Sequence, residues 1–289
     1  MPGQGEGRPH GDCGRVEDVT TRRSVGPSSP YHAPMLEDIL TSADRRAAVT
    51  ARNIDRLVEE AARAGGVRSF RSALIGDGIA VIAEIKRRSP SAGVISTDMD
   101  PVAHARAYER GGANAISVVT EPDFFNGSLD DLMAVREAVS IPVLRKDFTR
   151  NGAQIWEARA AGADAVLLIV ATLDDTTLRD LVGVAGDVGV DAIVEAHSLD
   201  EVRRATAAGA SIIGVNNRDL TTFVTDLAVA ESVAAALPSS VTTIAESGVS
   251  DPEGARRMRV AGYDAIHVGE ALVRHPDPAA FVAVLKGAR

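Results

Sequence analysis

The stretch Gly112-Ala113-Asn114-Ala115-Ile116 recurs, with small changes, as Gly162-Ala163-Asp164-Ala165-Val166, Gly209-Ala210-Ser211-Ile212-Ile213 and Gly262-Tyr263-Asp264-Ala265-Ile266. In each copy a helical pattern ends on glycine, which accepts a positive φ without a Cβ clash, and an aliphatic strand begins within a few residues. The copies are 50, 47 and 53 residues apart. Because one strand–helix unit of a barrel takes roughly 25 to 30 residues, each interval holds two units.

Eight aliphatic runs fit this spacing and are predicted to be strands. They are Ala80–Ile85, Ala115–Val119, Ile141–Leu144, Ala165–Val170, Ala192–Glu195, Ile212–Val215, Val241–Ala245 and Ala265–Val268. Helical patterns lie between them, among them Ser128–Ala138, Asp174–Val188, Leu199–Ala208 and Asp251–Ala261. This alternation predicts an α/β protein whose parallel strands close into a (β/α)8 TIM barrel. The alternative is an open doubly wound sheet, which is disfavoured because no Gly-x-Gly-x-x-Gly motif follows an early strand.

The first part of the chain has a different composition. Residues 1–34 are rich in glycine and proline and poor in large apolar side chains, which predicts a disordered tail. A second interpretation is that Met35 is the true initiator. Helical patterns over Met35–Val58 and Ser69–Leu74 predict an N-terminal helical extension within residues 35–78. We therefore expect a single TIM-barrel domain over residues 35–289, with the barrel itself over residues 79–289.

The composition disfavours several classes of partner. Lys and Arg number 31 against 40 Asp and Glu, and the net charge of −9 argues against a general nucleic-acid or anionic-membrane surface. Cys13 is the only cysteine, and no cysteine–histidine cluster has metal-ligand spacing. No apolar run approaches the ~18 to 20 residues of a membrane span, and the N-terminus lacks the apolar middle of a signal peptide. We therefore expect a cytoplasmic protein without a metal, a nucleic-acid partner or a membrane partner.

Ionisable residues gather where the predicted strands end, which is where the active sites of barrels lie. Glu84, Glu195 and Glu246 come from strands one, five and seven, and Lys86 and Lys146 come from strands one and three. Glu84 and Lys86 are two residues apart, so they project from the same face. Inward charges in an aliphatic barrel are costly unless they are paired or used. The cluster therefore predicts a functional site rather than a structural network.

A phosphate site is predicted beside this cluster. Gly248 follows strand seven and Gly269-Glu270 follows strand eight, where barrels commonly hold phosphate on main-chain N–H groups. Lys86 and Ser89 would add a cation and a hydroxyl donor. His197 follows strand five at the start of a helix, and it is predicted to cap that helix.

Several phrases at these positions resemble the indole-3-glycerol-phosphate synthase family, over about residues 35–289. They are Ile82–Ser91, Ser117–Ser128, Leu144–Phe148, Gly214–Leu220 and Ala245–Gly248. Each phrase is specific, and no position that the family uses for catalysis departs from its pattern. The resemblance implies the substrate 1-(2-carboxyphenylamino)-1-deoxyribulose 5-phosphate and the products indole-3-glycerol phosphate, carbon dioxide and water. It also implies a decarboxylating enzyme of tryptophan biosynthesis that uses no metal or organic cofactor.

The resemblance implies catalytic roles as well. Lys146 would be the general acid that protonates the substrate carbonyl. Independently of the resemblance, desolvation and neighbouring cations at the open end of a barrel are expected to lower the pKa of this lysine toward neutrality. Glu195 would support Lys146 or share in proton transfer. Glu84 and Lys86 would act as base and acid in the dehydration, and the division of labour between them stays open.

Other residues would bind the substrate. Glu246 and Asn216 would hold its hydroxyls and orient Lys146, and Arg218 would position the anthranilate part or a neighbouring carboxylate. The phosphate would be bound by loop residues, namely Ser247, Gly248, Gly269 and the N–H group of Glu270. The aromatic ring would lie against Phe125, Phe148 and Leu220, for each of which ordinary packing is the alternative.

Two other functions stay open at this point. One is a different barrel enzyme that acts on a sugar phosphate, such as phosphoribosylanthranilate isomerase or the tryptophan synthase α subunit. The isomerase pattern needs a cysteine near the end of strand one, where this chain has Glu84-Ile85-Lys86. The other is a non-catalytic phosphate-binding barrel subunit, which the retained charges disfavour. The expected partner is a phosphorylated small molecule, and association with other tryptophan-pathway enzymes is a further possibility.

Overall fold

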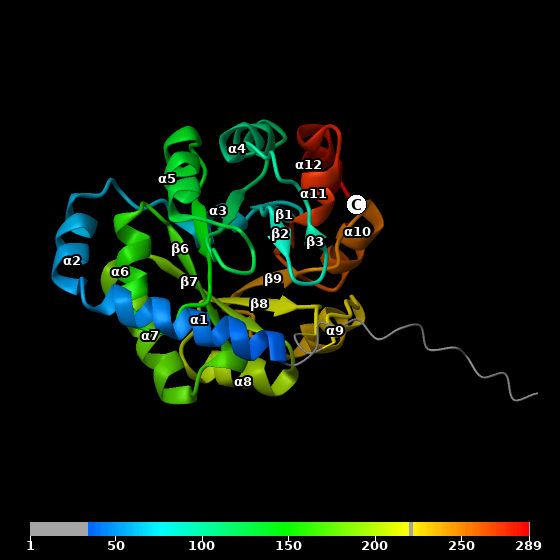
Figure 1. Cartoon of the computed structure of the whole chain (residues 1–289). Coiled ribbons are helices and arrows are strands. Elements are labelled where there is room, and N and C mark those ends of the chain that lie inside the picture. The colour runs from blue at the N-terminus through cyan, green and yellow to red at the C-terminus, as the bar shows by residue number, and fades with distance from the viewer. Residues whose placement is uncertain (1–33, 220–221, 289) are drawn as a thin grey trace, which may run out of the picture. The chain divides into compact units, whose positions relative to one another are not determined.

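A computed structural model describes residues 34–219 and 222–288, and its eight parallel strands close into a barrel (Figure 1). The strands are β1 (Ala80–Ile85), β4 (Ala115–Val119), β5 (Val143–Lys146), β6 (Ala165–Ile169), β7 (Asp191–Ala196), β8 (Ile212–Asn216), β9 (Thr242–Glu246) and β10 (Ala265–Val268). The ring closes because β1 pairs with both β4 and β10. This topology confirms the predicted (β/α)8 TIM barrel.

Helices surround the barrel and alternate with its strands along the chain. They are α4 (Pro101–Arg110), α5 (Leu129–Ala138), α6 (Gly152–Ala160), α7 (Asp175–Val188), α8 (Leu199–Ala207), α9 (Ala228–Val233), α10 (Pro252–Val260), α11 (Glu270–Arg274) and α12 (Pro278–Lys286). Ser128, Asp174 and Asp251 cap α5, α7 and α10, because each side chain accepts a main-chain N–H of the first turn. Within the described ranges, no helix is long and apolar enough to cross a membrane.

Strand side chains alternate between two cores. In β1, Ala83 packs outward into the cluster between strands and helices, whereas Ile82 packs inward with residues of the other strands. The inner cluster also contains Leu144, Ile193 and Ile244. Because side chains alternate along a strand, the residues two positions later also face inward, now at the C-terminal ends of the strands. These residues are Glu84, Lys146, Glu195 and Glu246.

The repeated phrase builds the opposite end of the barrel. Its glycines, Gly112, Gly162, Gly209 and Gly262, have φ values of +89°, +89°, +87° and +97°. The polar residue two positions later then accepts a main-chain N–H of the preceding strand in three of the copies. These bonds join Val81 to Asn114 at 3.2 Å, Val143 to Asp164 at 2.8 Å and Thr243 to Asp264 at 2.8 Å. The repeat thus ends a helix and hydrogen-bonds the start of one strand to the start of its neighbour.

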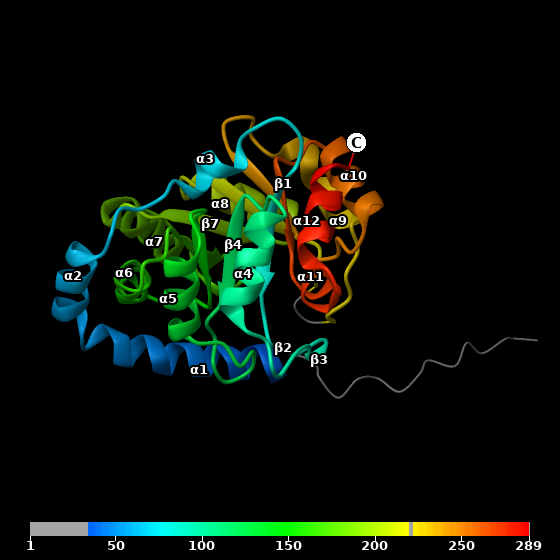
Figure 2. The ribbon, with the colours of Figure 1, turned by 90° about the horizontal axis from the view of Figure 1, so that it is seen from above.

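The N-terminal helices occupy both ends of the barrel. They are α1 (Pro34–Ala51), α2 (Ile54–Arg63) and α3 (Phe70–Leu74), so the helical pattern predicted as far as Val58 is broken at a turn over residues 52–53. Figure 2 shows α1 across one end of the barrel and α3 at the other. Phe70 and Leu74 of α3 join the inner cluster. The tail predicted over residues 1–34 lies outside the described residues, apart from Pro34, which begins α1.

The strand boundaries differ from the prediction mainly at β5. The predicted run Ile141–Leu144 is shifted, because β5 begins at Val143 and continues through Arg145 to Lys146. Both of these charged residues have partners, so their polarity does not end the strand. A small antiparallel hairpin of β2 (Arg88–Ser89) and β3 (Gly93–Val94) was not predicted, and it follows β1 on the side of the barrel that α1 crosses.

Candidate active site

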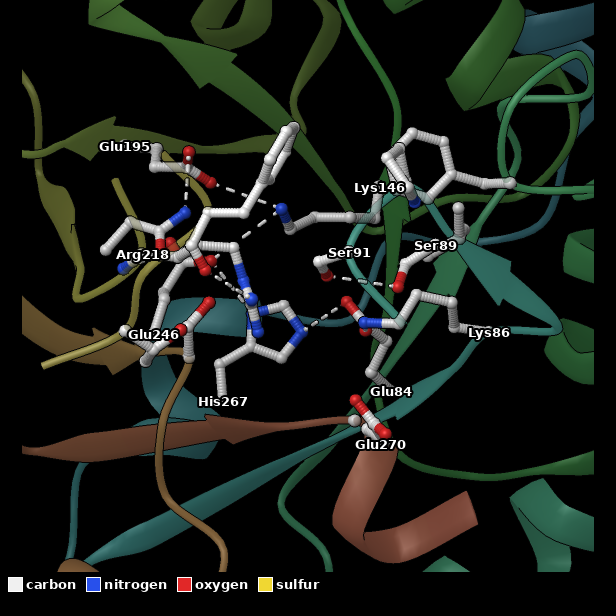
Figure 3. Close-up of a pocket in the computed structure, with 18 of the residues that line it drawn as sticks. Glu84, Lys86, Ser89, Ser91, Lys146, Glu195, Arg218, Glu246, His267 and Glu270 are labelled. Carbon is white, nitrogen blue, oxygen red and sulfur yellow. Dashed lines mark hydrogen bonds and ion pairs between the residues drawn. The ribbon is translucent and has the colours of Figure 1, made fainter. Parts of the chain in front are cut away.

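A cavity of about 480 Å³ lies at the C-terminal ends of the strands (Figure 3). Every predicted site residue that the structure describes lines it. These residues are Glu84, Lys86, Ser89, Phe125, Lys146, Phe148, Glu195, Asn216, Arg218, Glu246, Ser247, Gly248, Gly269 and Glu270. Leu220, the remaining predicted residue, lies outside the described residues.

Charged side chains form a continuous row along this cavity, and their signs alternate. Lys86 is paired with Glu84, and Lys146 Nζ lies 3.2 Å from Glu195 Oε2 and 3.9 Å from Glu246 Oε2. The two parts are joined by His267 of β10, whose ring lies between Glu84 and Glu246 in Figure 3. Three carboxylates therefore meet two lysines and one histidine.

His267 is the residue of this row that the sequence reasoning missed. Its Nδ1 atom lies 3.0 Å from Glu246 Oε2, and its Nε2 atom lies 3.3 Å from Glu84 Oε2. The signal was present, because His267 is the one polar residue in the run Ala265-Ile266-His267-Val268. It stands two residues after Ala265, an inward-facing member of the barrel core, so alternation places it inside the barrel.

Glu84 and Glu195 are ionised although they are buried. Burial disfavours the charge on Glu84, but the ammonium of Lys86 and the imidazole of His267 outweigh this and hold its pKa well below the usual value. Burial opposes ionisation of Glu195 in the same way, and Lys146 is the main group that lowers its pKa. Both groups are therefore carboxylates at neutral pH.

The prediction that the barrel mouth lowers the pKa of Lys146 is wrong. Burial does act in that direction, but Glu195, Glu246 and Glu84 together outweigh it and raise the pKa above its usual value. The sequence reasoning counted neighbouring cations, whereas the nearest charged groups are acids from β7 and β9. Lys146 is therefore a firmly protonated ammonium.

Asn216 acts on Lys146 through a carboxylate rather than directly. Its Nδ2 atom donates to Glu195 Oε1 at 3.1 Å, so it holds the group that pairs with the lysine. Its Oδ1 atom accepts the main-chain N–H of Arg218 at 3.0 Å, which fixes the start of the following loop. The guanidinium of Arg218 donates to the carbonyl of Phe223 at 3.1 Å within that loop.

Two glycines make room for the buried carboxylates. A Cβ atom on Gly214 of β8 would lie 2.0 Å from Glu246 Oε1, and one on Gly269 would lie 2.4 Å from Glu84 Oε1. Either contact is shorter than real Cβ atoms allow, so any side chain at these positions would displace a charged group of the row. The two glycines thus fix where Glu84 and Glu246 can sit.

Small polar residues form another part of the cavity wall. Ser247, directly after β9, has a φ of +63°, and Gly248 has a φ of +86°. A non-glycine residue with positive φ at a cavity wall is a strained arrangement that marks functional loops. Ser89 and Ser91 of the β2–β3 hairpin lie with their hydroxyl oxygens 3.3 Å apart on the same cavity. Ser91 was not predicted as a site residue.

An apolar wall completes the cavity. The rings of Phe125 and Phe148 lie with their centroids 6.2 Å apart, and Leu36 and Ile39 of α1 line the same cavity. Glu121, whose role the sequence left open, organises the loop that carries Phe125. Its carboxylate accepts the main-chain N–H groups of residues 123, 124 and 125 at 3.2, 2.7 and 3.1 Å.

His197 does not cap α8 as predicted. Ser198 is the N-cap, with its side chain accepting the N–H of Glu201. The main-chain N–H of His197 donates to Glu201 Oε2 at 2.7 Å, and its ring Nε2 atom lies 3.4 Å from Glu195 Oε1. His197 therefore lies beside Glu195 but is not among the residues that line the cavity.

Comparison with known proteins identifies relatives over nearly all of the described chain. The family model for indole-3-glycerol phosphate synthase matches residues 36–285. The indole-3-glycerol phosphate synthase of Mycolicibacterium vanbaalenii is 49% identical over 255 residues, which cover 88% of this chain and 94% of the relative. The protein of the same name from Streptomyces griseus is 48% identical and covers 85% of this chain and 90% of the relative.

Similar solved structures share the fold at low sequence identity. Thiamine phosphate pyrophosphorylase from Pyrococcus furiosus superposes with a TM-score of 0.56 at 19% identity, covering 75% of this chain and 96% of that one. The N-acetylmannosamine-6-phosphate 2-epimerase from Clostridium perfringens gives 0.55 at 15% identity, covering 72% and 92%. These likenesses support the barrel fold alone. The family match and the close relatives show that the chain belongs to the indole-3-glycerol phosphate synthase family.

Proposed function

We propose that the protein is the lyase that converts 1-(2-carboxyphenylamino)-1-deoxyribulose 5-phosphate into indole-3-glycerol phosphate, carbon dioxide and water. One observation carries this proposal: cations and carboxylates alternate along one cavity of about 480 Å³ that also has an apolar wall. The substrate has a carbonyl, a carboxylate, a phosphate and an aromatic ring, so it needs proton donors, proton acceptors, cations and apolar contacts in one place. Family membership favours this reaction over other sugar-phosphate chemistry.

Ring closure needs a proton donor at the substrate carbonyl, and we assign this role to Lys146. Its raised pKa keeps the ammonium protonated, and Glu195 and Glu246 hold it in place. As the aromatic carbon that bears the carboxylate attacks the carbonyl carbon, the oxygen takes a proton from Lys146 and becomes a hydroxyl. Carbon dioxide then leaves, and its bonding electrons restore the aromatic ring.

Decarboxylation consumes one proton in each turnover, so Lys146 must be protonated again from solvent. Its side chain is 20% exposed, which gives water access to the ammonium. Glu195 keeps the protonated form favoured, because the ammonium is the form that pairs with its carboxylate.

Dehydration needs an acid and a base, and the pair of Lys86 and Glu84 supplies both. The lowered pKa of Glu84 makes it a carboxylate at the start, so we assign it as the base and Lys86 as the acid. Lys86 protonates the leaving hydroxyl, which departs as water, while Glu84 accepts the anilinic proton. A proton from the ring methylene then returns to the nitrogen and completes the indole. Because the two side chains are paired, Glu84 can return its proton to Lys86.

The remaining cavity residues are assigned to substrate binding. Ser247, Gly248, Gly269, the N–H group of Glu270, and Ser89 with Lys86 would hold the phosphate. Phe125 and Phe148 would enclose the aromatic ring, and Arg218 would face the anthranilate carboxylate. Glu246 and Asn216 would accept and donate hydrogen bonds to the substrate hydroxyls.

The wider setting is also part of the proposal. We place the catalytic domain at residues 35–289, and the reaction in the cytoplasm as a step of tryptophan biosynthesis. The single cysteine fits a reducing compartment. Association with other enzymes of the pathway would be tested by co-purification from a tagged strain.

Complementation tests the proposed function in a cell. A tryptophan auxotroph that lacks only this synthase should grow without tryptophan when it carries the full-length chain. The same chain with Lys146→Ala should not restore growth at equal protein level. Failure of the unaltered chain, when it is produced in folded form, would refute the proposal.

A further inference from the structure

His267 lies at the middle of the charged row rather than at its edge. It projects into the barrel from β10, between the neighbouring strands β1 and β9, and only 5% of its side chain is exposed. Each ring nitrogen lies close to a carboxylate of a different strand, Glu246 at 3.0 Å and Glu84 at 3.3 Å. A buried histidine that only filled space would not need an acid at both nitrogens.

The charge state of His267 follows from this geometry. A neutral imidazole has one N–H donor, so its other nitrogen would present a lone pair to a carboxylate oxygen. The imidazolium form donates from both nitrogens and satisfies both acids. Burial alone would favour the neutral ring, but the hydrogen bond to Glu246 and the nearby carboxylate of Glu84 raise the pKa of His267 to about 9.

The groups around His267 come from four strands. Glu84 faces it from β1, with Lys86 beyond, and Glu246 faces it from β9. Lys146 of β5 lies 3.9 Å from the same Glu246 oxygen that His267 contacts, and it pairs in turn with Glu195 of β7. Among the described residues, His267 is therefore in contact both with the pair assigned to dehydration and with the group assigned to ring closure.

We propose that His267 is a positioning residue of the synthase site, which holds Glu84 and Glu246 through both ring nitrogens and thereby aligns Lys86 and Lys146 with one bound substrate. This inference rests on the proposed function. Without the imidazolium, two buried carboxylates would face each other across the space that the ring fills. Each would turn towards its own lysine, and the spacing between the two proton donors would change.

Kinetics of three variants test the proposal. His267→Asn keeps an N–H donor near the Nδ1 position, which faces Glu246, and His267→Gln keeps one near the Nε2 position, which faces Glu84. His267→Leu keeps neither. We expect kcat to fall at least about tenfold in every variant, most in His267→Leu, with KM changed less than about threefold, because alignment rather than substrate contact is lost. His104→Gln is the control and should retain normal kcat, because this half-buried histidine of α4 does not line the cavity.

The pH profile separates alignment from simple packing. Loss of the cation raises the pKa of Glu84, so the acidic limb of kcat should move to higher pH in all three variants. The wild-type protein should also lose activity near pH 9 as His267 is deprotonated, and this component should be absent from the variants. A change in KM with unchanged kcat, or unchanged kcat and pH limbs in folded variants, would overturn the proposal.

A measurement on the unaltered protein needs no His267 variant. In 15N-histidine spectra, His267 should keep both ring nitrogens protonated at pH 8, with its resonance assigned by elimination from single glutamine variants of the other five histidines. A neutral His267 ring at pH 7 would overturn the proposal even if every His267 variant failed to fold. If the unaltered protein makes no indole-3-glycerol phosphate, the proposed function fails instead, and the spectra still decide whether His267 bridges the two acids as a cation.

Discussion

Buried carboxylates have different kinds of partner at the two ends of the barrel. At the N-terminal end, Asp164 is fully buried and its two oxygens accept main-chain N–H groups of Val143 at 2.8 Å and Arg68 at 2.7 Å, with Arg136 Nη2 farther away at 3.5 Å. At the C-terminal end, the contacts described for the carboxylates of Glu84 and Glu246 are with side chains alone. The Oε1 atom of Glu246 has no hydrogen-bond partner among the described residues. Burial alone therefore does not distinguish a structural acid from a functional one.

The kind of partner makes the distinction. Main-chain N–H groups are held in place by the backbone, so a carboxylate that accepts them is fixed and contributes to stability. Lysine and histidine side chains can shift, exchange protons and release the carboxylate to a substrate. An unsatisfied carboxylate oxygen at the C-terminal end of the barrel is thus expected of a site whose remaining hydrogen bonds are made by its ligand. Substitutions at the two ends should separate loss of activity from loss of stability.

Among substitutions at the C-terminal end of the barrel, Lys146→Ala should have the largest effect on turnover. Without the general acid, turnover should fall by a factor of about 10² or more, and the protein should still fold. Steady-state kinetics with far-UV circular dichroism would check both expectations. Near-normal turnover in a folded Lys146→Ala protein would remove Lys146 from the mechanism.

Glu84→Gln should reduce turnover by a factor of about 10², because the amide keeps the size of the side chain but cannot accept a proton. Glu253→Gln is a matched control, since Glu253 is exposed on α10 and pairs only with Arg256 among the contacts described. The control should retain normal turnover. An active Glu84→Gln protein would mean that another group is the base in dehydration.

Asp164→Ala should show the opposite behaviour at the other end. Two buried main-chain N–H groups would lose their acceptor, which should lower the free energy of unfolding by about 2 kcal/mol. The melting temperature should fall by roughly 6 °C, whereas kcat at 25 °C should stay unchanged. Thermal denaturation and kinetics on the same sample would check this. Lost turnover in the folded variant would contradict the division between the two ends.

The smallest effect is expected for the pH dependence of the unfolding free energy in Glu195→Gln. The folded-state pKa of Glu195 is lowered, so its charge stabilises the fold above the unfolded-state pKa of about 4.3, and this contribution is lost as the pH falls through the folded-state value. The difference in unfolding free energy between the wild type and Glu195→Gln should therefore be constant from pH 6 to 8 and shrink below about pH 4.5. Denaturant unfolding at several pH values would measure it. A difference that does not vary with pH would show that folding does not shift the pKa of Glu195.

Sequence patterns predicted the strand bounds well where a strand is mostly aliphatic and is followed by polar residues. β1, β4 and β10 have the predicted bounds, because each is a mostly aliphatic run, and in β4 and β10 the repeated phrase also marks where the preceding helix ends. β5 was misplaced because it ends on Arg145 and Lys146, which read as loop residues until their partners from other elements are known. The β2–β3 hairpin has two residues in each strand, which is too short for any periodicity to reveal.

The sequence predicted which residues line the site better than it predicted their charge states. Strand ends sufficed to predict that Glu84, Lys146 and Glu195 share one cavity, because parallel strands of a barrel all end on the same side. The pKa direction of Lys146 could not be predicted, since it depends on distances to acids that are about 50 and 100 residues away in the chain. His267 was missed because the reasoning examined the ends of strands and not their interiors.

Direct assay of the reaction tests the central claim most directly. The purified full-length protein would be mixed with 1-(2-carboxyphenylamino)-1-deoxyribulose 5-phosphate, and indole-3-glycerol phosphate would be followed by its fluorescence and identified by mass. We predict one carbon dioxide released for each indole-3-glycerol phosphate formed, with both lost in Lys146→Ala. A folded wild-type protein that leaves this substrate unchanged would contradict the claim.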